Sequence, residues 1–211
     1  MRQTHWHHRP LAVVVATICL ALLATACGGD NPVNRKSASP SSSPQTTYTD
    51  PSHGYSLTYD SALLAPVTKQ STVDSMSVYV MPNPEMGLAL MPRESQAGSD
   101  ITFLVSAWIS LGDYSYDQYL KVLPRFLNVY ATYYKGDDGK GDVVSKLKTV
   151  DGLRALSYRF RNKAPNFGWL WGDSTIVLTK QGWVQVVVVG SGKQPAPESR
   201  ALLDAASTLK L

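Results

Sequence analysis

The chain has 211 residues, of which 44% are hydrophobic and 17% charged, with 20 Lys and Arg, 16 Asp and Glu, and two Cys. This composition is typical of a globular protein and excludes a largely disordered one. Two cysteines are too few for a disulfide-rich scaffold or a cysteine-rich zinc site. A formal net charge of +4 does not indicate nucleic-acid binding unless the positive charge is concentrated in one patch, so we expect no nucleic-acid partner.

The first 26 residues predict an export signal. A basic segment with Arg2 and Arg9 precedes the uncharged residues 11–26. As a helix these would rise about 24 Å, less than the roughly 30 Å hydrocarbon core of a bilayer, which favours a removable signal over a permanent span. Residues 23–29, LATACGG, resemble the lipobox of bacterial lipoproteins, although Ala24 stands where that motif most often has leucine. An ordinary secretory signal and an uncleaved anchor are the alternatives.

The lipobox resemblance implies cleavage before Cys27, diacylglycerol on its thiol and an acyl chain on its new amino group. Cys19 would leave with the signal, so the mature chain would keep no free thiol, and we expect no cofactor or metal besides these acyl chains. The protein would be anchored on the extracytoplasmic face of the cell membrane. The predicted divisions are a signal peptide (1–26), a lipidated cysteine with a flexible Ser/Pro-rich tether (27–47) and one globular domain (48–211).

In the first half of the domain, alternating hydrophobicity predicts strands at residues 55–59, 75–81 and 101–109, with a short strand at 87–91. A helix follows, because Ser115 and Gln118 have the spacing of a capping box and apolar residues then recur at helical spacing through Leu127. Pro124 predicts a kink or break in this helix. Whether the helix continues through residues 128–134 is left open.

In the second half, Asp151-Gly152 lies between two alternating runs and predicts a two-residue hairpin in which Val150 faces Leu153. Opposite residues of a hairpin share a face. One face then holds Val143, Ser145, Leu147, Leu156, Tyr158 and Phe160. The other holds Val144, Lys146, Lys148, Ala155, Ser157, Arg159 and Arg161. The apolar and basic residues separate, which supports this register.

Two further strands, at 174–179 and 183–189, are predicted before a closing helix that starts at Pro197. The run of four valines at 186–189 has no polar face, as expected of a strand covered on both sides. One stripe of the closing helix holds Leu202, Ala205, Ala206 and Leu209. We therefore expect an α+β fold, a mainly antiparallel β-sheet flanked by helices.

The order of elements resembles the PsbP-like α/β/α sandwich family. The resemblance is carried by Tyr48-Thr49-Asp50, GYSLTY at 54–59, the mid-chain helix, VDGLRA at 150–155 and STL at 207–209. In many relatives the second strand runs into Tyr-Pro and a nearby Trp, whereas Tyr59 here is followed by Asp60-Ser61 with no Trp nearby. The resemblance implies a non-enzymatic binding or assembly factor.

Two groups of side chains are candidate contact sites. The basic hairpin face, with Lys146, Lys148, Arg159 and Arg161, would suit anionic lipid headgroups or an anionic wall polymer, and is otherwise an ordinary solvated face. Phe167, Trp169 and Trp171 lie in a Gly-flanked segment predicted to be a turn. They would contact an envelope protein, a glycan or a hydrophobic ligand, or else close the end of the core.

Catalytic chemistry has few candidate residues. His53 is the only histidine after Cys27, so a histidine-based zinc site is not expected. A Ser-His-Asp triad would have to use His53 with Asp50 and Ser52, against the alternative of a turn histidine. We therefore expect a non-catalytic, membrane-anchored binding or assembly module. The alternatives are a carrier that holds a hydrophobic ligand between sheet and helix, and a cell-envelope hydrolase.

Overall fold

The computed structural model describes residues 43–94, 101–136, 139–164 and 168–211. The strands are β1 (Gln45–Thr49), β2 (Ser56–Asp60), β3 (Leu64–Pro66), β4 (Glu85–Pro92), β5 (Thr102–Ser110), β6 (Asp142–Val150), β7 (Leu153–Ala164), β8 (Gly168–Leu178) and β9 (Gly182–Ser191). The helices are α1 (Gln70–Met76), α2 (Tyr116–Tyr133) and α3 (Arg200–Ser207), with the 3₁₀ turns η1 (Ser77–Tyr79) and η3 (Pro197–Ser199).

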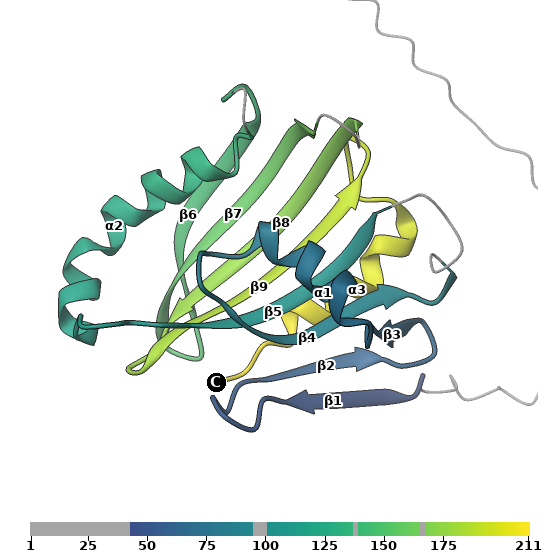
Figure 1. The fold of residues 1–211 in the computed structure, drawn as a ribbon, viewed down its shortest axis with the longest axis horizontal. Helices are drawn as coiled ribbons and strands as arrows, with labels where there is room; N and C mark the ends of the chain where they lie inside the picture. Colours follow the sequence, from purple (N-terminus) through teal and green to yellow (C-terminus); the bar gives the residue numbers. More distant parts are fainter. Residues whose placement is uncertain (1–42, 95–100, 137–138, 165–167) are drawn as a thin grey trace, which may run out of the picture. The chain divides into compact units, whose positions relative to one another are not determined.

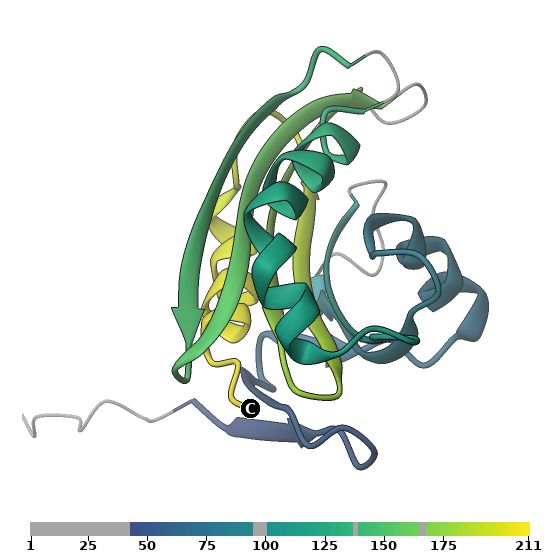
Figure 2. The same ribbon diagram turned by 90° about the vertical axis from the view of Figure 1, so that its left-hand side faces the viewer.

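A sheet between two helical layers organises these elements. Within the described ranges, seven strands pair antiparallel in the order β3-β4-β5-β9-β8-β7-β6, and β1 and β2 form a separate antiparallel pair. Figures 1 and 2 show α1 and α2 on one side of the sheet and α3 on the other. The predicted α+β class, with a mainly antiparallel sheet flanked by helices, is confirmed. No helix in the described ranges combines the length and apolarity that a membrane span needs.

Strand β9 lies at the centre of the sheet and contributes to both hydrophobic cores. Val187 and Val189 pack in the core on the α2 side, and Val186 and Val188 pack in the core on the α3 side. All residues of β9 except the last are buried. The prediction that the valine run is covered on both faces is therefore confirmed.

The β6–β7 hairpin has the register that the sequence predicts. Val150 is opposite Leu153, and Lys148 is opposite Ala155. Asp151 and Gly152 have φ values of 47° and 78°, in the left-handed region that a type I′ turn requires at both central positions. The turn chemistry thus sets the register, and the register places the basic side chains on one face.

Helix α2 starts at the predicted cap and continues past Pro124. The Ser115 hydroxyl accepts a hydrogen bond from the Gln118 backbone at 3.3 Å, and the Gln118 side-chain oxygen accepts one from the Ser115 backbone at 2.7 Å. The helix ends at Tyr133, so residues 128–133 do continue it. Leu123 is buried next to the proline, and Tyr134 is buried just beyond the helix, which shows that packing outweighs the missing backbone hydrogen bond.

Residues 75–81 do not form the predicted strand. They end α1 and form η1 instead. The alternation of Met76, Val78 and Val80 suggests a strand, but Val78 is 61% exposed. Val73 and Met76, the buried residues of α1, are three positions apart, as on one side of a helix, whereas Val80 and Met81 are buried in the segment after η1.

Three boundaries also differ from prediction. Strand β1 begins at Gln45 and pairs with β2, so the last three residues of the expected tether belong to the folded part. The segment expected to be an aromatic turn is mostly strand, because β8 begins at Gly168. Pro197 starts η3, a 3₁₀ turn, and the closing helix α3 begins at Arg200.

Candidate functional site

The α3 face of the sheet is only partly covered. Helix α3 has eight residues and is about 12 Å long. Its Leu202 and Ala205 share a core with Val186 and Val188 of the central strand β9. Cross-strand pairing puts the basic hairpin face on this same side, since Lys148 is opposite Ala155 and that residue belongs to the α3-side core. The outer strands β6 to β8 therefore present polar side chains beside α3.

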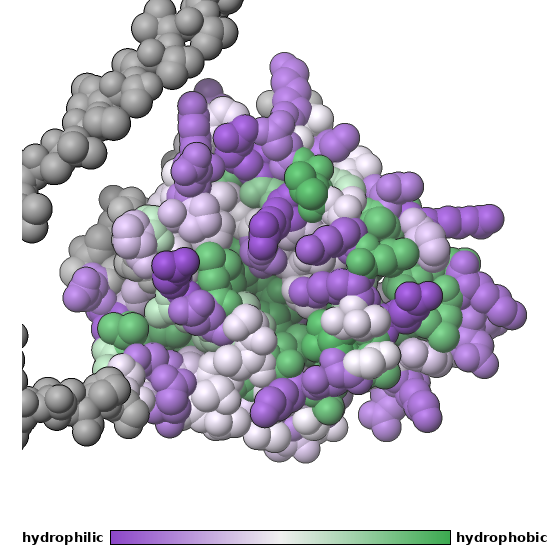
Figure 3. Space-filling view, turned by 180° about the vertical axis from the view of Figure 1, so that it is seen from behind, coloured by the Kyte–Doolittle hydropathy of each residue, from purple (hydrophilic) through white to green (hydrophobic). Residues whose placement is uncertain are grey.

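A cleft of about 530 Å³ lies between these outer strands and α3. Its described lining residues are Lys148, Arg159, Phe160, Arg161, Trp171, Gly172, Asp173 and Thr175 from the strands, Lys193, Gln194 and Pro195 from the segment after β9, and Leu203, Ala206 and Ser207 from α3. Figure 3 views the molecule from the α3 side and shows a hollow with an apolar (green) floor flanked by hydrophilic (purple) side chains. The volume lies in the range of sites for small organic ligands.

The cleft is positively charged. Among its described lining residues, Lys148, Arg159, Arg161 and Lys193 are cationic and Asp173 alone is anionic. Arg159 Nε donates to Asp173 Oδ2 at 3.0 Å, an exposed pair that contributes little stability. Three of the four cations thus remain without a neutralising group among the lining residues.

The cations differ in their own partners. Arg161 donates through Nε to Oδ2 of Asp142, outside the cleft, at 3.1 Å. Lys148 Nζ donates to Thr175 Oγ1 at 2.9 Å. Within the described ranges, neither Lys148 nor Lys193 forms an ion pair with a carboxylate. These two ammonium groups are the ones with most capacity for an added anion.

Lys148 is also partly desolvated. Burial lowers its pKa below the ordinary value for lysine, the Asp173 carboxylate opposes this, and the positive charges of Lys146 and Arg159 lower the pKa further. A bound anion would favour the charged ammonium and raise that pKa again. The positive charges around Lys148 therefore favour the binding of an anion in the cleft.

Two of the three predicted aromatic residues lie at this site. The Trp169 ring has Arg161 Cζ at 5.5 Å and Lys193 Nζ at 5.3 Å from its centroid, the distances of cation–π contacts. Trp171 is 4% exposed and lines the cleft. In the part of the chain that the structure describes, its Nε1 has no hydrogen-bond partner. Phe167 lies outside the described residues.

The structure thus joins two sites that the sequence suggested separately. Lys148, Arg159 and Arg161 meet Trp171 in one cleft, whereas Lys146 lies on the same face but outside the lining. Sequence reasoning missed Lys193 and the α3 residues Leu203, Ala206 and Ser207. Lys193 lies in the segment after β9, which has no periodic pattern of hydrophobic residues. The sequence also does not show which strands α3 leaves uncovered, so the lining residues of α3 could not be predicted.

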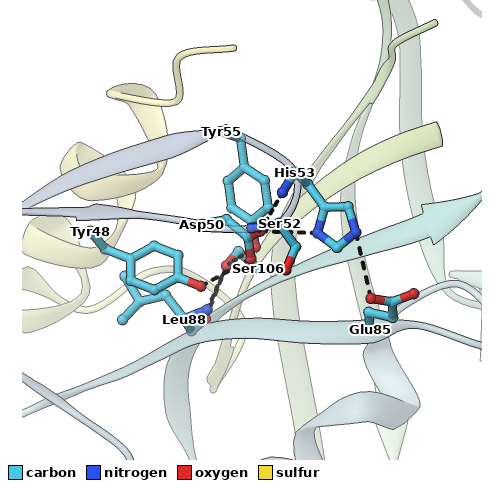
Figure 4. A network of polar contacts seen from close by, with 8 residues as sticks. All are labelled: Tyr48, Asp50, Ser52, His53, Tyr55, Glu85, Leu88 and Ser106. Carbon is cyan, nitrogen blue, oxygen red and sulfur yellow. Dashed lines mark hydrogen bonds and ion pairs between the residues drawn. The ribbon is translucent and has the colours of Figure 1, made fainter. Parts of the chain in front are cut away.

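The environment of His53 is that of a stabilised turn. His53 Nδ1 lies 3.0 Å from Asp50 Oδ1, and Nε2 lies 3.5 Å from Glu85 Oε2. Figure 4 shows the imidazole between these two carboxylates. Its ring stacks on Trp108 with 4.1 Å between centroids. Ser52 contacts Asp50 through its backbone N–H. A triad needs a nucleophilic hydroxyl at Nε2, and a carboxylate is there instead.

A metal-binding cluster or another hollow would be a further candidate site among the described residues. No cluster of three or more potential metal-ligating His, Cys, Asp or Glu side chains occurs in the described ranges. A second hollow, of about 600 Å³, lies along α2 and is lined by Tyr114, Gln118, Tyr119, Lys121, Val122, Arg125, Phe126 and Val129. All of these come from one continuous segment, so this hollow is a surface groove. The basic cleft, in contrast, is lined by several strands and by α3.

Comparison with known proteins finds similarity in structure and none in sequence. No family model matches the chain, and no curated protein matches it in sequence. The solution structure of cyanobacterial PsbP (CyanoP) from Synechocystis sp. PCC 6803 is similar to this chain with a TM-score of 0.47 and 13% sequence identity, over 80% of this chain and 93% of that one. PsbP-like proteins are also the family that the sequence pattern resembles.

Proposed function

We propose that this protein is a non-catalytic binding module of the cell envelope that receives an anionic partner in the basic cleft. The observation that carries the proposal is the convergence of Lys148, Arg159, Arg161 and Lys193 around one hollow. The lipobox-like residues before Cys27 support an extracytoplasmic location, with diacylglycerol on Cys27 as the membrane anchor. The partner would then be a component of the membrane surface or the cell wall.

The groups in the cleft favour binding over reaction. Asp173, its one described carboxylate, already accepts a hydrogen bond from Arg159, and the Thr175 hydroxyl accepts one from Lys148. The Ser207 hydroxyl donates to the Asp204 carbonyl oxygen at 2.6 Å. Among the described lining residues, the hydroxyls of Thr175 and Ser207 and the carboxylate of Asp173 are thus each engaged in a hydrogen bond within the protein. What the cleft offers a ligand is positive charge next to apolar surface.

The anion proposal is tested with inorganic polyphosphate as the probe. We expect Lys148→Gln with Lys193→Gln to weaken binding about tenfold or more, because each lost ammonium removes a charge-assisted hydrogen bond. Binding of the unmodified chain should weaken with added salt. Titration calorimetry measures both effects. As pH rises, the affinity for polyphosphate should start to fall at a lower pH than it would for a lysine of ordinary pKa. The reason is that burial lowers the pKa of Lys148, which then loses its charge earlier.

The matched control is Lys121→Gln with Arg125→Gln, which removes the same charge on α2, on the other side of the sheet. This pair should bind polyphosphate as the unmodified chain does. Equal losses in the two pairs would mean that net charge, and not the cleft, attracts the probe. Absence of binding at low salt would refute the proposal.

The anchor is tested separately. Cys27→Ala should abolish incorporation of labelled palmitate and release the chain from the membrane fraction, because the thiol that accepts the lipid is gone. Cys19→Ala should leave labelling unchanged. Labelling that persists in the Cys27 variant would exclude the lipoprotein assignment without affecting the cleft.

A further inference from the structure

We infer that the anionic partner is an amphiphile with a phosphate-like head and a hydrocarbon chain, bound with its head against the strands and its chain against α3. This inference rests on the proposed function and specifies the ligand class of the same cleft. It comes from the division of the cleft into a charged wall and an apolar wall.

The charged wall is formed by β6, β7 and β8. Lys148 uses one of its three N–H groups on Thr175, and Arg159 uses Nε on Asp173. The Arg159 side chain is 79% exposed, so its terminal N–H groups face solvent. Free ammonium and guanidinium donors beside each other suit an oxygen-rich anion such as a phosphate monoester.

The apolar wall is formed by α3 and the segment that leads to it. Leu203 and Ala206 line the cleft, three residues apart and therefore on one side of the helix. The adjacent positions Leu202 and Ala205 point into the core. A polyanion without a hydrocarbon part would leave the Leu203 and Ala206 surface in contact with water, whereas an alkyl chain would cover it. Burial of each methylene is expected to raise affinity about fourfold.

Trp171 adds a third feature to the cleft. Its indole is buried, yet Nε1 donates to no acceptor in the described part of the chain. The Nε1 edge of the ring packs against Gly190, so the indole contributes an apolar lining to the cleft and not an accessible donor. Trp171 therefore extends the apolar part of the cleft beside the cationic residues, which favours a ligand with both an anionic head and hydrocarbon.

The experiment compares four probes of defined chemistry. The full lipidated chain in phosphatidylcholine nanodiscs is titrated with inorganic phosphate, butyl phosphate, octyl phosphate and neutral octyl glucoside, all below micellar concentrations, with empty nanodiscs to subtract partitioning. Tryptophan fluorescence and calorimetry report binding. We expect affinity to rise from inorganic phosphate to butyl phosphate to octyl phosphate, at least tenfold in the last step, and octyl glucoside to bind at least tenfold more weakly than octyl phosphate.

Variants of the charged wall and of the apolar wall should separate the contribution of the anionic head to affinity from that of the hydrocarbon chain. Lys148→Met with Lys193→Met should reduce the preference for octyl phosphate over octyl glucoside, because two of the four cations that would hold the anionic head are lost. Leu203→Asn should reduce the gain from butyl to octyl while leaving inorganic phosphate binding unchanged. Ala206→Asn tests the same wall if the Leu203 variant fails to fold. Val129→Asn, at an exposed position on α2, is the matched control and should change neither property.

The outcomes distinguish the two proposals. If phosphate and polyphosphate bind but chain length has no effect, the amphiphile inference is wrong and the anion-binding function stands. If octyl glucoside binds as tightly as octyl phosphate, the head is not selected and the inference is also wrong. If none of the anionic probes binds, the proposed function itself is refuted.

Discussion

The carboxylate of Asp50 holds the turn between β1 and β2. It accepts hydrogen bonds from the backbone N–H groups of Ser52 and His53 at 3.0 and 2.8 Å, and from the hydroxyl of Tyr48 at 3.1 Å. Burial by itself would raise the pKa of Asp50, but these hydrogen bonds and the His53 imidazole bring it below the ordinary value for aspartate. The ionised carboxylate is therefore stabilised by folding.

This network predicts an acid-sensitive contribution to stability. Because the pKa of Asp50 is lower in the folded state, its contribution is fully present above the ordinary pKa of about 4 and is lost as pH falls through the folded-state value. Asp50→Asn should lower the free energy of unfolding by about 1–3 kcal/mol at pH 7 and show a smaller further loss toward pH 2. Urea unfolding between pH 2 and pH 7 measures this. The exposed Asp74→Asn is the control, and an Asp50 variant with the same pH profile as the unmodified chain would contradict the prediction.

Gly190 holds the Trp171 indole in the cleft. A Cβ at this position would lie 2.4 Å from Cζ2 of the ring, closer than real side chains approach. Gly190→Ala should therefore displace Trp171, destabilise the fold by about 1–3 kcal/mol and weaken octyl phosphate binding. Thermal unfolding and the fluorescence titration test the two effects. Adding Trp171→Phe should recover part of the stability, since residues in contact are coupled, and full additivity would contradict this account.

At the scale of elements, alternation predicted β5 and the β6–β7 hairpin correctly but failed at residues 75–81. Asp151-Gly152 determines which hairpin residues face each other, so the face shared by Lys148, Arg159 and Arg161 follows from the sequence. At residues 75–81 the same alternation misleads, because no turn constrains a short run and helical burial of Val73 and Met76 accounts for the structure instead.

Pro124 is an unfavourable residue that α2 tolerates. It removes the backbone N–H that would bond to residue 120 in the previous turn, and its side chain is exposed. We expect Pro124→Ala to raise the free energy of unfolding by about 1 kcal/mol or more, because it restores a helix hydrogen bond without removing core packing. Chemical denaturation measures the change. Arg125→Ala, the exposed neighbour, should stay within about 0.5 kcal/mol, and a destabilised proline variant would mean that a bend at Pro124 is needed for packing.

At the scale of the whole molecule, the cleft depends on what α3 does not cover. The sequence predicts the amphipathic α3 and the basic hairpin. Each hydrophobic pattern predicts the structure of one element and does not predict how two elements pack together. That Leu202 and Ala205 pack over β9, leaving Leu203 and Ala206 beside the basic strands, depends on contacts between residues far apart in the chain. For the same reason Lys193, in the segment that leads to α3, had no sequence signal.

The shared strand β9 predicts that the two cores unfold together. Its valines alternate between the α2-side core, which contains Trp183, and the α3-side core, which contains Trp171. Neither core keeps its packing if β9 leaves the sheet, so unfolding should be two-state. With fluorotryptophan incorporated, the ¹⁹F signals of both residues, assigned by Trp→Phe variants, should disappear at the same urea concentration.

A bound ligand makes this test more specific. Octyl phosphate that binds only the folded state should raise the urea midpoint of both signals equally, although it contacts only the α3 side, because the cores share one transition. A midpoint that rises for Trp171 alone would show that the α3 face opens independently of the α2-side core. The cleft would then be built on a separately folding layer, and its ligand would stabilise that layer rather than the whole domain.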